Sequence, residues 1–438
     1  MAKRVIIIGG GFAGLAAGVR LSERGFEVVI VERRNHLGGR AYSFRDPTTG
    51  DIVDNGQHLF MGCYHHTIAF LKKLGTLEKL KFQERTRVDF LDAKNGLDSF
   101  ACPKLPAPLH VLAGLFKLKG LTIGDKLRAF NLSSTLRGKA TTNGALTVAE
   151  WLKKLKQSAN ISKRFWTPLV VATLNESPDV ASAKMLIKVL QEAFGGGRAA
   201  SAIGISSVGL SDLYTQDAKH FIESRGGKIQ VLARAHKILI RDDQVVGVEL
   251  TGGEIINADY VISAVPPNVL FEMLDDDLRE KHFAYLAKLK SSAIVSINLW
   301  FDRPLTDRQF IGLIGTETQW LFNKDAIALT TKPSNHLALI ISAANQYTNW
   351  TKHQLVEMAM RDLQALIPQS HEAKLLHATI VKEREATIAH TVESDRLRPD
   401  AQTPIANFFL AGDWTNTGFP ATIESAVLSG NTAAQLIV

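Results

Sequence analysis

The chain has 438 residues, of which 45% are hydrophobic and 21% are charged, so it can bury a large core and is long enough for two domains. Its only cysteines, Cys63 and Cys102, exclude a disulfide framework and a cysteine-rich metal site, and the 13 histidines show no metal-site spacing. No apolar run approaches the roughly 20 residues that span a bilayer, and a strand-like run stands where a signal peptide would. We therefore expect a cytoplasmic protein without a metal.

The first 32 residues predict a strand, a glycine turn, a helix and a second strand. Residues 4–8 form a β-branched run, residues 15–25 have helical apolar spacing that ends at Gly25, and residues 27–32 form another apolar run. This order is typical of a βαβ unit in a parallel, doubly wound sheet. We therefore predict an α/β fold with a Rossmann-like domain.

The glycine turn carries a dinucleotide-binding pattern. Gly9 permits a tight turn, Gly11 lets the backbone approach a pyrophosphate, and Gly14 lets the helix pack on the strand. The first helical N–H groups, at Ala13 and its neighbours, are free to bind phosphate. Glu32 follows 18 residues after Gly14 and can accept hydrogen bonds from a ribose.

The residues after the second strand favour FAD over a nicotinamide cofactor. Glu32 would repel the 2′-phosphate of NADP, despite the basic Arg33 beside it, and Arg33 is counted among the expected cofactor contacts. A glycine pair that ends at Gly39 permits close backbone approach, and Arg40 can neutralise phosphate or a flavin edge.

The middle of the chain, residues 105–200, is predicted to be mainly helical, with a capping box at Thr147 and a helix over about 180–194. Residues 104–164 hold 12 Lys and Arg against two acids, and leucines are interleaved with the cations. This pattern suits an amphipathic surface that touches anionic lipid, and it also fits an ordinary solvated helical face. No nucleic-acid-binding motif is present, so we expect no nucleic acid partner.

The second half of the chain returns to strands. Residues 228–267 predict a β-meander followed by a buried strand, residues 290–390 mix strands with a helix over 352–366, and residues 407–413 form a last buried strand before a helix from about Glu424. We predict a discontinuous FAD-binding domain over 1–65, 215–270 and 395–438. We predict a substrate-binding domain over 66–214 and 271–394, in which 104–200 is a basic, mainly helical, membrane-facing subdomain.

The C-terminal segment LAGDWTNTGFPATIESAVLSG supplies a second set of expected flavin contacts. Gly412 and Asp413 end the buried strand, and the carboxylate of Asp413 can accept a hydrogen bond from a ribityl hydroxyl. Ala421, Thr422 and Ile423 enter the last helix, whose N–H groups can face the flavin edge where negative charge develops on reduction.

Three pieces of the chain, GGGFAG…E…GGR, GGKIQVLARAHKI to ISAVPP, and LAGDW…G…ATIESAVLSG, resemble the flavin amine oxidase and phytoene desaturase superfamily. The resemblance covers the whole chain in order. It implies non-covalent FAD in a Rossmann-like domain with an inserted α+β substrate domain, and it implies that a backbone segment at Ala235 brackets the adenine.

Four internal strings narrow the resemblance: VDNGQHLFMGCY, RFWTPLVVATLNESPDVASAKM, SSVGLSDLY and SINLWFDRP. Together they resemble the hydroxysqualene dehydroxylases, the squalene-associated FAD-dependent enzymes of bacterial hopanoid pathways. The resemblance implies reduction of hydroxysqualene to squalene by reduced FAD, with loss of water. It also implies a long apolar isoprenoid substrate, an electron donor that the sequence does not name, and peripheral association with the inner face of a membrane.

The stretch DNGQHLFMG, residues 54–62, has two interpretations. Asn-Gly is a strong turn signal, so the stretch fits a surface turn. In the superfamily the matching stretch lies along the flavin ring, which implies that Gly56, Gln57 and His58 contact the flavin. A general acid is needed for water to leave, and His58 is the first candidate and Asp54 the second.

A long hydrocarbon also needs an apolar channel, for which we name eight aromatic and aliphatic candidates, each of which could be ordinary core: Phe165, Trp166, Leu169, Leu174, Trp300, Phe301, Trp320 and Phe322.

Three other functions share the scaffold. A carotenoid or phytoene desaturase would use the same FAD motifs in the oxidative direction. An amine oxidase is disfavoured because we expect neither cysteine to lie near the C-terminal flavin helix for covalent attachment, and no obvious aromatic pair precedes Gly412. A non-enzymatic prenyl-lipid carrier would have little use for a complete flavin site.

Overall fold

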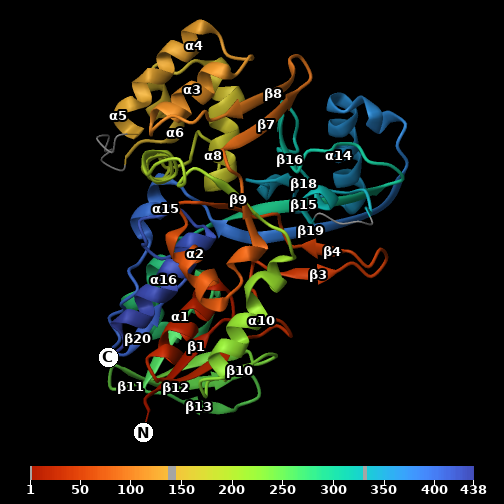
Figure 1. Cartoon of the computed structure of the whole chain (residues 1–438). Coiled ribbons are helices and arrows are strands. Elements are labelled where there is room, and N and C mark those ends of the chain that lie inside the picture. The colour runs from red at the N-terminus through yellow and green to blue at the C-terminus, as the bar shows by residue number, and fades with distance from the viewer. Residues whose placement is uncertain (1, 137–144, 329–332) are drawn as a thin grey trace.

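The computed structural model describes residues 2–136, 145–328 and 333–438 and has two layered regions (Figure 1). The lower region in Figure 1 contains a parallel sheet and both ends of the chain. The upper region contains a larger sheet and a group of short helices. This is the mixed α/β class that the sequence predicts.

A five-stranded sheet forms the centre of the lower region, and all of its neighbouring strands are parallel. The predicted N-terminal βαβ unit is confirmed, because α1 (Phe12–Glu23) connects the two strands on either side of it in sequence. The sheet takes its strands from three distant stretches of the chain. In spatial order they are β10 (Lys228–Gln230), β2 (Glu27–Val31), β1 (Arg4–Ile8), β14 (Tyr260–Ser263) and β20 (Phe408–Leu410).

Alternating residues of β1 enter two separate cores, because successive side chains of a strand point to opposite faces of the sheet. Val5 and Ile7 pack with a layer of helices, whereas Ile6 and Ile8 pack on the other side. The helices are α1, α2 (His65–Leu74), α10 (Leu210–Glu223) and α16 (Ile423–Leu436). The other face carries the predicted meander, confirmed as β11 (Ala235–Arg241), β12 (Gln244–Leu250) and β13 (Ile255–Asn257).

A seven-stranded, mostly antiparallel sheet spans the upper region. The predicted helix over 352–366 is confirmed as α14 (Lys352–Leu366), and it packs its apolar side on one face of this sheet. In spatial order the strands are β19 (Leu375–Ile388), β15 (Ser291–Phe301), β18 (His336–Ile341), β17 (Trp320–Asn323), β16 (Phe310–Ile314), β7 (Arg87–Asp92) and β8 (Gly96–Ala101).

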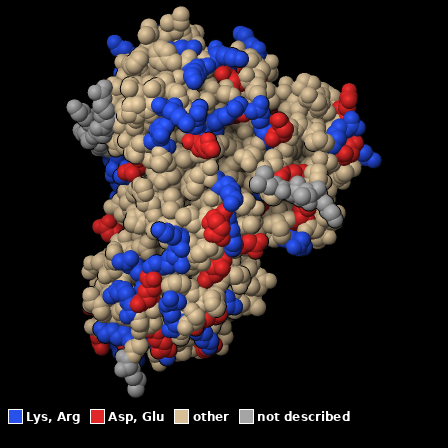
Figure 2. Space-filling model, viewed as in Figure 1, with Lys and Arg blue, Asp and Glu red and all other residues tan. Residues whose placement is uncertain are grey.

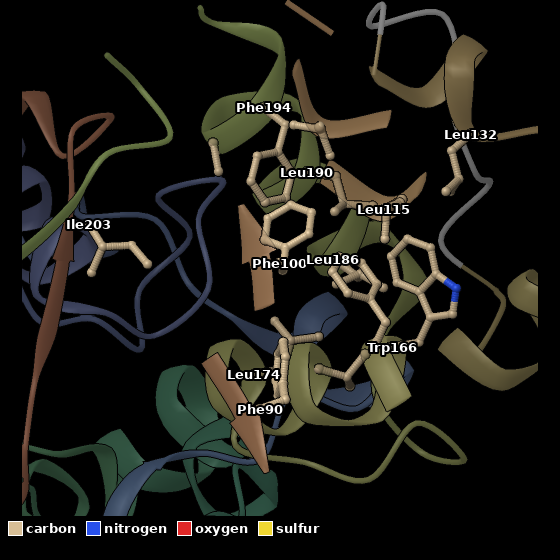
Figure 3. Packing of buried hydrophobic residues seen from close by; sticks show 14 of the residues in the cluster. Phe90, Phe100, Leu115, Leu132, Trp166, Leu174, Leu186, Leu190, Phe194 and Ile203 are labelled. Carbon is tan, nitrogen blue, oxygen red and sulfur yellow. The ribbon is translucent and has the colours of Figure 1, made fainter. Parts of the chain in front are cut away.

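The opposite face of this sheet packs against the helical segment predicted for residues 105–200. Aromatic and aliphatic side chains from both parts form one buried cluster, in which Phe100, Trp166 and Phe194 converge (Figure 3). The helices, beginning with the pair at the top of Figure 1, are α3 (Leu109–Lys117), α4 (Ile123–Arg128), α5 (Ser133–Leu136), α6 (Val148–Lys154), α7 (Ala159–Ile161), α8 (Thr167–Leu174) and α9 (Ala183–Leu190).

The capping box predicted at Thr147 is confirmed, since its side chain and that of Glu150 bond each other's backbone N–H groups. The helix predicted to begin near residue 180 begins instead at Ala183. The residues before it, Ala181 and Ser182, form isolated β-bridges to Thr391 and Thr147, which keeps their backbone extended.

The remaining described elements are short and connect these layers. Among the described residues, no helix has both the length and the apolarity needed to cross a bilayer. The connecting elements are β3 (Ser43–Arg45), β4 (Ile52–Asp54), β5 (Leu59–Met61), β6 (Leu80–Phe82), β9 (Ile203–Ser206), α11 (Pro267–Met273), α12 (Asp276–Leu278), α13 (Lys324–Ala328) and α15 (Val392–Leu397), together with short 3-10 and π turns.

Candidate active site

A single cavity of about 620 Å³ runs from the parallel sheet into the upper region. Its polar end is lined by the glycine turn after β1, the loop after β2, the segment after β4, the segment after β14 and the segment after β20. Its other end is lined by aromatic and aliphatic side chains of the upper sheet and helices. All the predicted cofactor-binding residues except Gly14 lie on its wall: Gly9, Gly11, Ala13, Glu32, Arg33, Gly39, Arg40, Gly56, Gln57, His58, Ala235, Gly412, Asp413, Ala421, Thr422 and Ile423.

The three motif glycines have different surroundings. Gly9 has φ +107°, which favours glycine, and it starts the turn. Gly11 is the N-cap of α1, and a Cβ placed on it would lie 3.7 Å from Gly39 Cα, an ordinary contact, at a point where both glycines line the cavity. A Cβ on Gly14 would lie 2.0 Å from the carbonyl oxygen of Gly9, so Gly14 serves helix–strand packing.

The carboxylate of Glu32 holds the glycine turn in place by hydrogen bonds. It is buried and accepts hydrogen bonds from the N–H groups of Gly10 at 2.8 Å and Arg34 at 2.9 Å. Glu32 and Arg34 both line the cavity, so this acid holds the loop and keeps oxygen lone pairs available to a ribose. Arg34 was not among the predicted contacts, because only the acid has a fixed place in the motif.

An ion pair joins the two ends of the sequence at the cavity wall. The guanidinium of Arg40 bonds the carboxylate of Asp413 and donates to the carbonyl oxygen of Ala386 at 2.9 Å. Burial alone would lower the pKa of Arg40, but the interaction with Asp413 outweighs burial and raises it. Arg40 therefore stays charged beside the cavity and ties the loop after β2 to the end of β20.

Asp54, at the end of β4, is fully engaged with protein donors. Its carboxylate is buried and accepts from Ser43 Oγ at 2.8 Å, from the N–H of Leu210 at 3.0 Å and from Lys324 Nζ at 2.7 Å. Burial would raise the pKa of Asp54, but Lys324 and the other donors lower it. The cavity lining does not include Asp54. These contacts suit an anchor for the loop rather than a proton donor to a bound molecule.

The following residues face the cavity. A Cβ on Gly56 would meet nothing within 4 Å, and Gln57 accepts from Lys324 Nζ at 2.7 Å. The ring of His58 lines the cavity without a hydrogen bond to any described residue, and its pKa is lowered, by burial first and by Arg40 second, against the opposing effect of Asp54. The stretch is thus a cavity wall and not a surface turn.

The start of α16 is held by side chains that the sequence did not reveal. The N–H of Ala421 donates to His390 Nε2 at 2.6 Å, so Nδ1 carries the ring proton and faces Asp395 Oδ1 at 3.2 Å. Glu424 is buried and accepts from the N–H groups of His66 and Thr67, each at 2.8 Å, at the start of α2. Neither partner is close in sequence, so no local pattern could have identified them.

Arg398 holds the chain after β20 in a similar way. Its buried guanidinium donates to the carbonyl oxygen of Asp413 at 3.0 Å and to that of Thr415. Burial lowers the pKa of Arg398. The loop that carries the Asp413 carboxylate is therefore fixed from behind by a second arginine.

The expectation that no cysteine approaches the flavin segment needs correction. Cys63 lines the same cavity as Ile423, and Glu424 in α16 is near enough to affect its thiol. Burial raises the pKa of the Cys63 thiol to about 12. A thiol with this pKa is not a nucleophile at neutral pH.

The apolar end of the cavity contains half of the predicted channel residues. Phe165, Leu169, Trp320 and Phe322 line it. The other four are corrected to core. Trp166 and Leu174 are buried in the helical cluster (Figure 3), Phe301 packs on the α14 side of the sheet, and Trp300 stacks on His336 and donates to Asp51. The lining residues that prediction missed include Phe90, Phe100, Val189, Phe194, Ile203, Phe310 and Ile340.

A family model for flavin containing amine oxidoreductases matches residues 12–438. The chain belongs to this family. FAD is therefore the cofactor of the site, as the motifs predicted, and the described residues fit it. Gly11 and Gly56 line the cavity without side chains, the first N–H groups of α1 are free of intrahelical partners, and Arg40 supplies a positive charge.

Full-length relatives in this family are similar to the chain at comparable identity. The hydroxysqualene dehydroxylase of Rhodopseudomonas palustris is 30% identical over 443 residues, which cover 100% of this chain and 99% of that protein. The hydroxysqualene dehydroxylase of Zymomonas mobilis is 28% identical, covering 98% of both chains. The 15-cis-phytoene desaturase of Narcissus pseudonarcissus is 28% identical, covering 99% of this chain and 79% of that protein. These homologues confirm the resemblance stated from the motifs.

Solved structures of low sequence identity confirm the fold. An oxidoreductase from Methanosarcina mazei has a TM-score of 0.79 at 19% identity, covering 99% of this chain and 100% of that chain. A putrescine oxidase bound to putrescine has a TM-score of 0.72 at 14% identity, covering 100% and 99%. The chain is thus an FAD-dependent oxidoreductase whose fold is shared by proteins with different substrates.

Proposed function

We propose that this protein is a hydroxysqualene dehydroxylase, which reduces hydroxysqualene to squalene and water in squalene and hopanoid biosynthesis. The observation that carries the proposal is the single cavity that joins a dinucleotide cradle to an apolar channel, with His58 on its wall. A long hydrocarbon fits such a channel, because burying apolar surface is favourable by roughly 25 cal/mol per Å². Homologues of that name at 28–30% identity add support.

The reaction removes an allylic hydroxyl and replaces it with hydrogen. The carbon–oxygen bond breaks with its electron pair on oxygen, which takes up a proton and leaves as water, and a carbon–hydrogen bond forms. Bound FAD in its reduced form supplies the hydride and its two electrons. The chain must supply the remaining functions, namely a proton for the departing oxygen, a fixed position for the allylic carbon and a site from which bulk water is excluded.

His58 is the proposed proton donor. Its ring lines the cavity and is bound to no described residue, so it is free to contact a substrate oxygen. Its lowered pKa makes the protonated form a stronger acid than an ordinary imidazolium. We assign Asp54, the second candidate, to anchoring the loop, because its carboxylate already accepts three hydrogen bonds and pairs with Lys324.

A carotenoid or phytoene-type desaturase on a C30 or C40 substrate is the alternative. It is favoured by the 15-cis-phytoene desaturases that match this chain over 99% of its length at 26–28% identity. Such an enzyme would use the same cavity and the same cradle but would run the flavin in the oxidative direction. The two functions differ in product and in the flavin state that reacts.

Product analysis under anaerobic conditions separates the two functions. Purified protein with bound FAD would be reduced chemically and given hydroxysqualene in detergent. Squalene in amounts that match the reduced flavin is the expected result. If no squalene forms, and the oxidised protein instead dehydrogenates phytoene or dehydrosqualene, the protein is a desaturase and the proposal is wrong.

A further inference from the structure

Six large apolar side chains are exposed between residues 105 and 130, a segment that includes the helices α3 and α4 at the top of Figure 1. Ile123 is 78% exposed and Leu127 is 58% exposed, and with Phe130 they recur at the spacing of one helical face over α4 and the turn that follows. The rings of Phe116 and Phe130 are 5.4 Å apart, which joins α3 to α4 at the surface. We call this set the apolar ridge: Leu105, Leu109, Phe116, Ile123, Leu127 and Phe130.

Basic side chains outnumber acids in the segment that carries the apolar ridge, although Arg164 pairs with Asp92 of β7 at 3.2 Å. Figure 2 shows Lys and Arg spread over this part of the molecule, with some Asp and Glu and wide uncharged areas between them. Of the two acids in residues 104–164, Asp125 is buried and bonded to Ser158 and Asn160, and Glu150 caps α6. The basic residues that the structure describes here are Lys104, Lys117, Lys119, Lys126, Arg128, Lys153, Lys154, Lys156, Lys163 and Arg164.

The apolar ridge lies on the outer side of the helices that close the apolar end of the cavity. On α3, Phe116 is exposed whereas Leu115 is buried in the cluster that contains Phe100 (Figure 3). The helix is close to that ring, since a Cβ on Gly114 would lie 2.9 Å from Phe100. Phe100 itself lines the cavity. One helix layer therefore separates the ridge from the apolar channel.

We propose that the apolar ridge and its surrounding lysines form a docking surface for an anionic lipid bilayer. The apolar tips would enter the boundary between headgroups and acyl chains, and the lysines would contact acidic headgroups. Charge complementarity selects this occupant, because a cationic rim around aliphatic and phenyl side chains matches a surface with negative headgroups above hydrocarbon. The apolar substrate of the proposed function gives a reason for such docking, and the surface is tested without any substrate.

The first test changes the apolar side chains alone. The purified FAD-bound protein and its I123S/L127S variant would be sedimented with vesicles of phosphatidylcholine containing 30% or no phosphatidylglycerol, a composition chosen on the order of natural acidic lipid content. We expect I123S/L127S to lower the partition coefficient by at least tenfold, since each side chain loses its burial in lipid. The matched control is I255S/L376S, which removes side chains that are 56% and 60% exposed on other surfaces.

The second test changes the charge. K117Q/K119Q should lower binding to the anionic vesicles by roughly tenfold or more, at about fivefold for each lysine near an acidic surface. K228Q/K237Q changes two exposed lysines outside the segment and should bind as the parent does. Binding should also weaken as salt rises from 0.05 to 0.5 M on the order-of-magnitude scale of charge screening.

Three results would overturn the proposal. The parent protein could fail to bind either vesicle, or I123S/L127S could bind as well as I255S/L376S. The parent could also be a dimer in light scattering that becomes monomeric in I123S/L127S and binds no vesicle, which would assign the ridge to a second copy of the chain. None of these results bears on the dehydroxylase assay, so the two proposals stand or fall separately.

Discussion

Gly11 and Gly14 belong to one motif, yet the structure gives them different tasks. Gly11 adopts φ −83° and ψ −173°, a conformation open to any residue, and a Cβ on it would make only an ordinary contact, 3.7 Å, with Gly39 at the cavity wall. Gly14 has no such room, because the carbonyl of Gly9 occupies the position of a Cβ. Gly11 therefore serves the cofactor and Gly14 serves the fold.

This difference predicts opposite effects for two alanine substitutions. G11A should lower FAD affinity by at least tenfold, because a methyl group would meet the phosphates, and it should change the free energy of unfolding by less than about 1 kcal/mol. G14A should destabilise the apoprotein by about 1–3 kcal/mol, the usual cost of overpacking. Flavin titration measures the FAD affinity of each variant, and denaturant unfolding of the apoprotein measures its free energy of unfolding. A G11A apoprotein less stable than G14A would contradict this assignment.

The lowered pKa of His58 predicts how the rate of dehydroxylation depends on pH. Its lowered pKa lies below 6.5, so the protonated fraction grows as pH falls towards that pKa. If protonated His58 gives the proton to the leaving oxygen, kcat/KM for dehydroxylation should rise as the pH is lowered from 8 to 6. In H58Q the rate should fall by about 10²- to 10⁴-fold and lose this dependence, with FAD still bound. H220Q, at an exposed histidine, is the control. Loss of FAD from H58Q would make the residue structural.

At the scale of elements, Lys324 connects two parts of the chain that are far apart in sequence. It is the first residue of α13, and it bonds both Asp54 at the end of β4 and Gln57 on the cavity wall. The pair of Lys324 and Asp54 is almost fully buried. Removing one member of a buried pair leaves an uncompensated charge, which costs more than removing both.

K324M should therefore destabilise the protein by about 3–5 kcal/mol, and the double variant K324M/D54N should recover part of that loss. Denaturant unfolding of both single variants and the double variant gives the coupling energy, expected at about 1–3 kcal/mol. A coupling energy near zero would mean that the two side chains act independently. H58Q in the same assay shows how much a change on the loop alone contributes.

Elements with a clear hydrophobic period or cap signal were predictable from the sequence. Side-chain partners that are far apart in the sequence were not. The helix α14 and the capping box at Thr147 have local signals, namely apolar spacing and paired cap residues. Lys324 has no local signal, because its partners are more than 260 residues away. The predicted domain limits and the roles of the site residues stay predictions.

Only half of the predicted channel residues line the cavity, and the reason is similar. In β17, Trp320 and Phe322 share the face that looks into the cavity, while Leu321 between them packs in the core on the α14 side. In β15 both faces are buried, so Trp300 and Phe301 resemble channel residues in sequence although neither lines the cavity. Alternation divides a strand into two faces, but it does not tell which face a ligand would meet.

At the scale of the whole molecule, buried histidines connect stability to pH. The pKa values of His58, His110, His336 and His390 are all lowered, with burial as the first cause, and that of His336 falls to about 3. A lowered pKa in the folded state means that the neutral form stabilises the fold above pH 6.5. This contribution is lost as the pH falls below 6.5, because only the unfolded chain takes up the proton.

The free energy of unfolding should therefore fall between pH 6.5 and pH 5, with about 2 kcal/mol from His336 alone. Denaturant unfolding at pH 7, 6 and 5 measures the slope. H336Q should be less stable at pH 7 but should lose less on acidification, whereas H220Q should follow the parent. A slope in H336Q equal to that of the parent would contradict this account.

The strand order of the parallel sheet has a consequence for synthesis on the ribosome. β1 is complete after Ile8, but β20, next to β14 in the same sheet, ends only at Leu410. At a translation rate of about 5–20 residues per second, the first strand waits for roughly 20–80 seconds before the sheet can close. The ion pair between Arg40 and Asp413 can form only after a similar delay. A nascent chain that stops before residue 400 would lack the C-terminal part of the flavin site. It would also expose the apolar edge strand of the unfinished sheet, the kind of surface that chaperones bind.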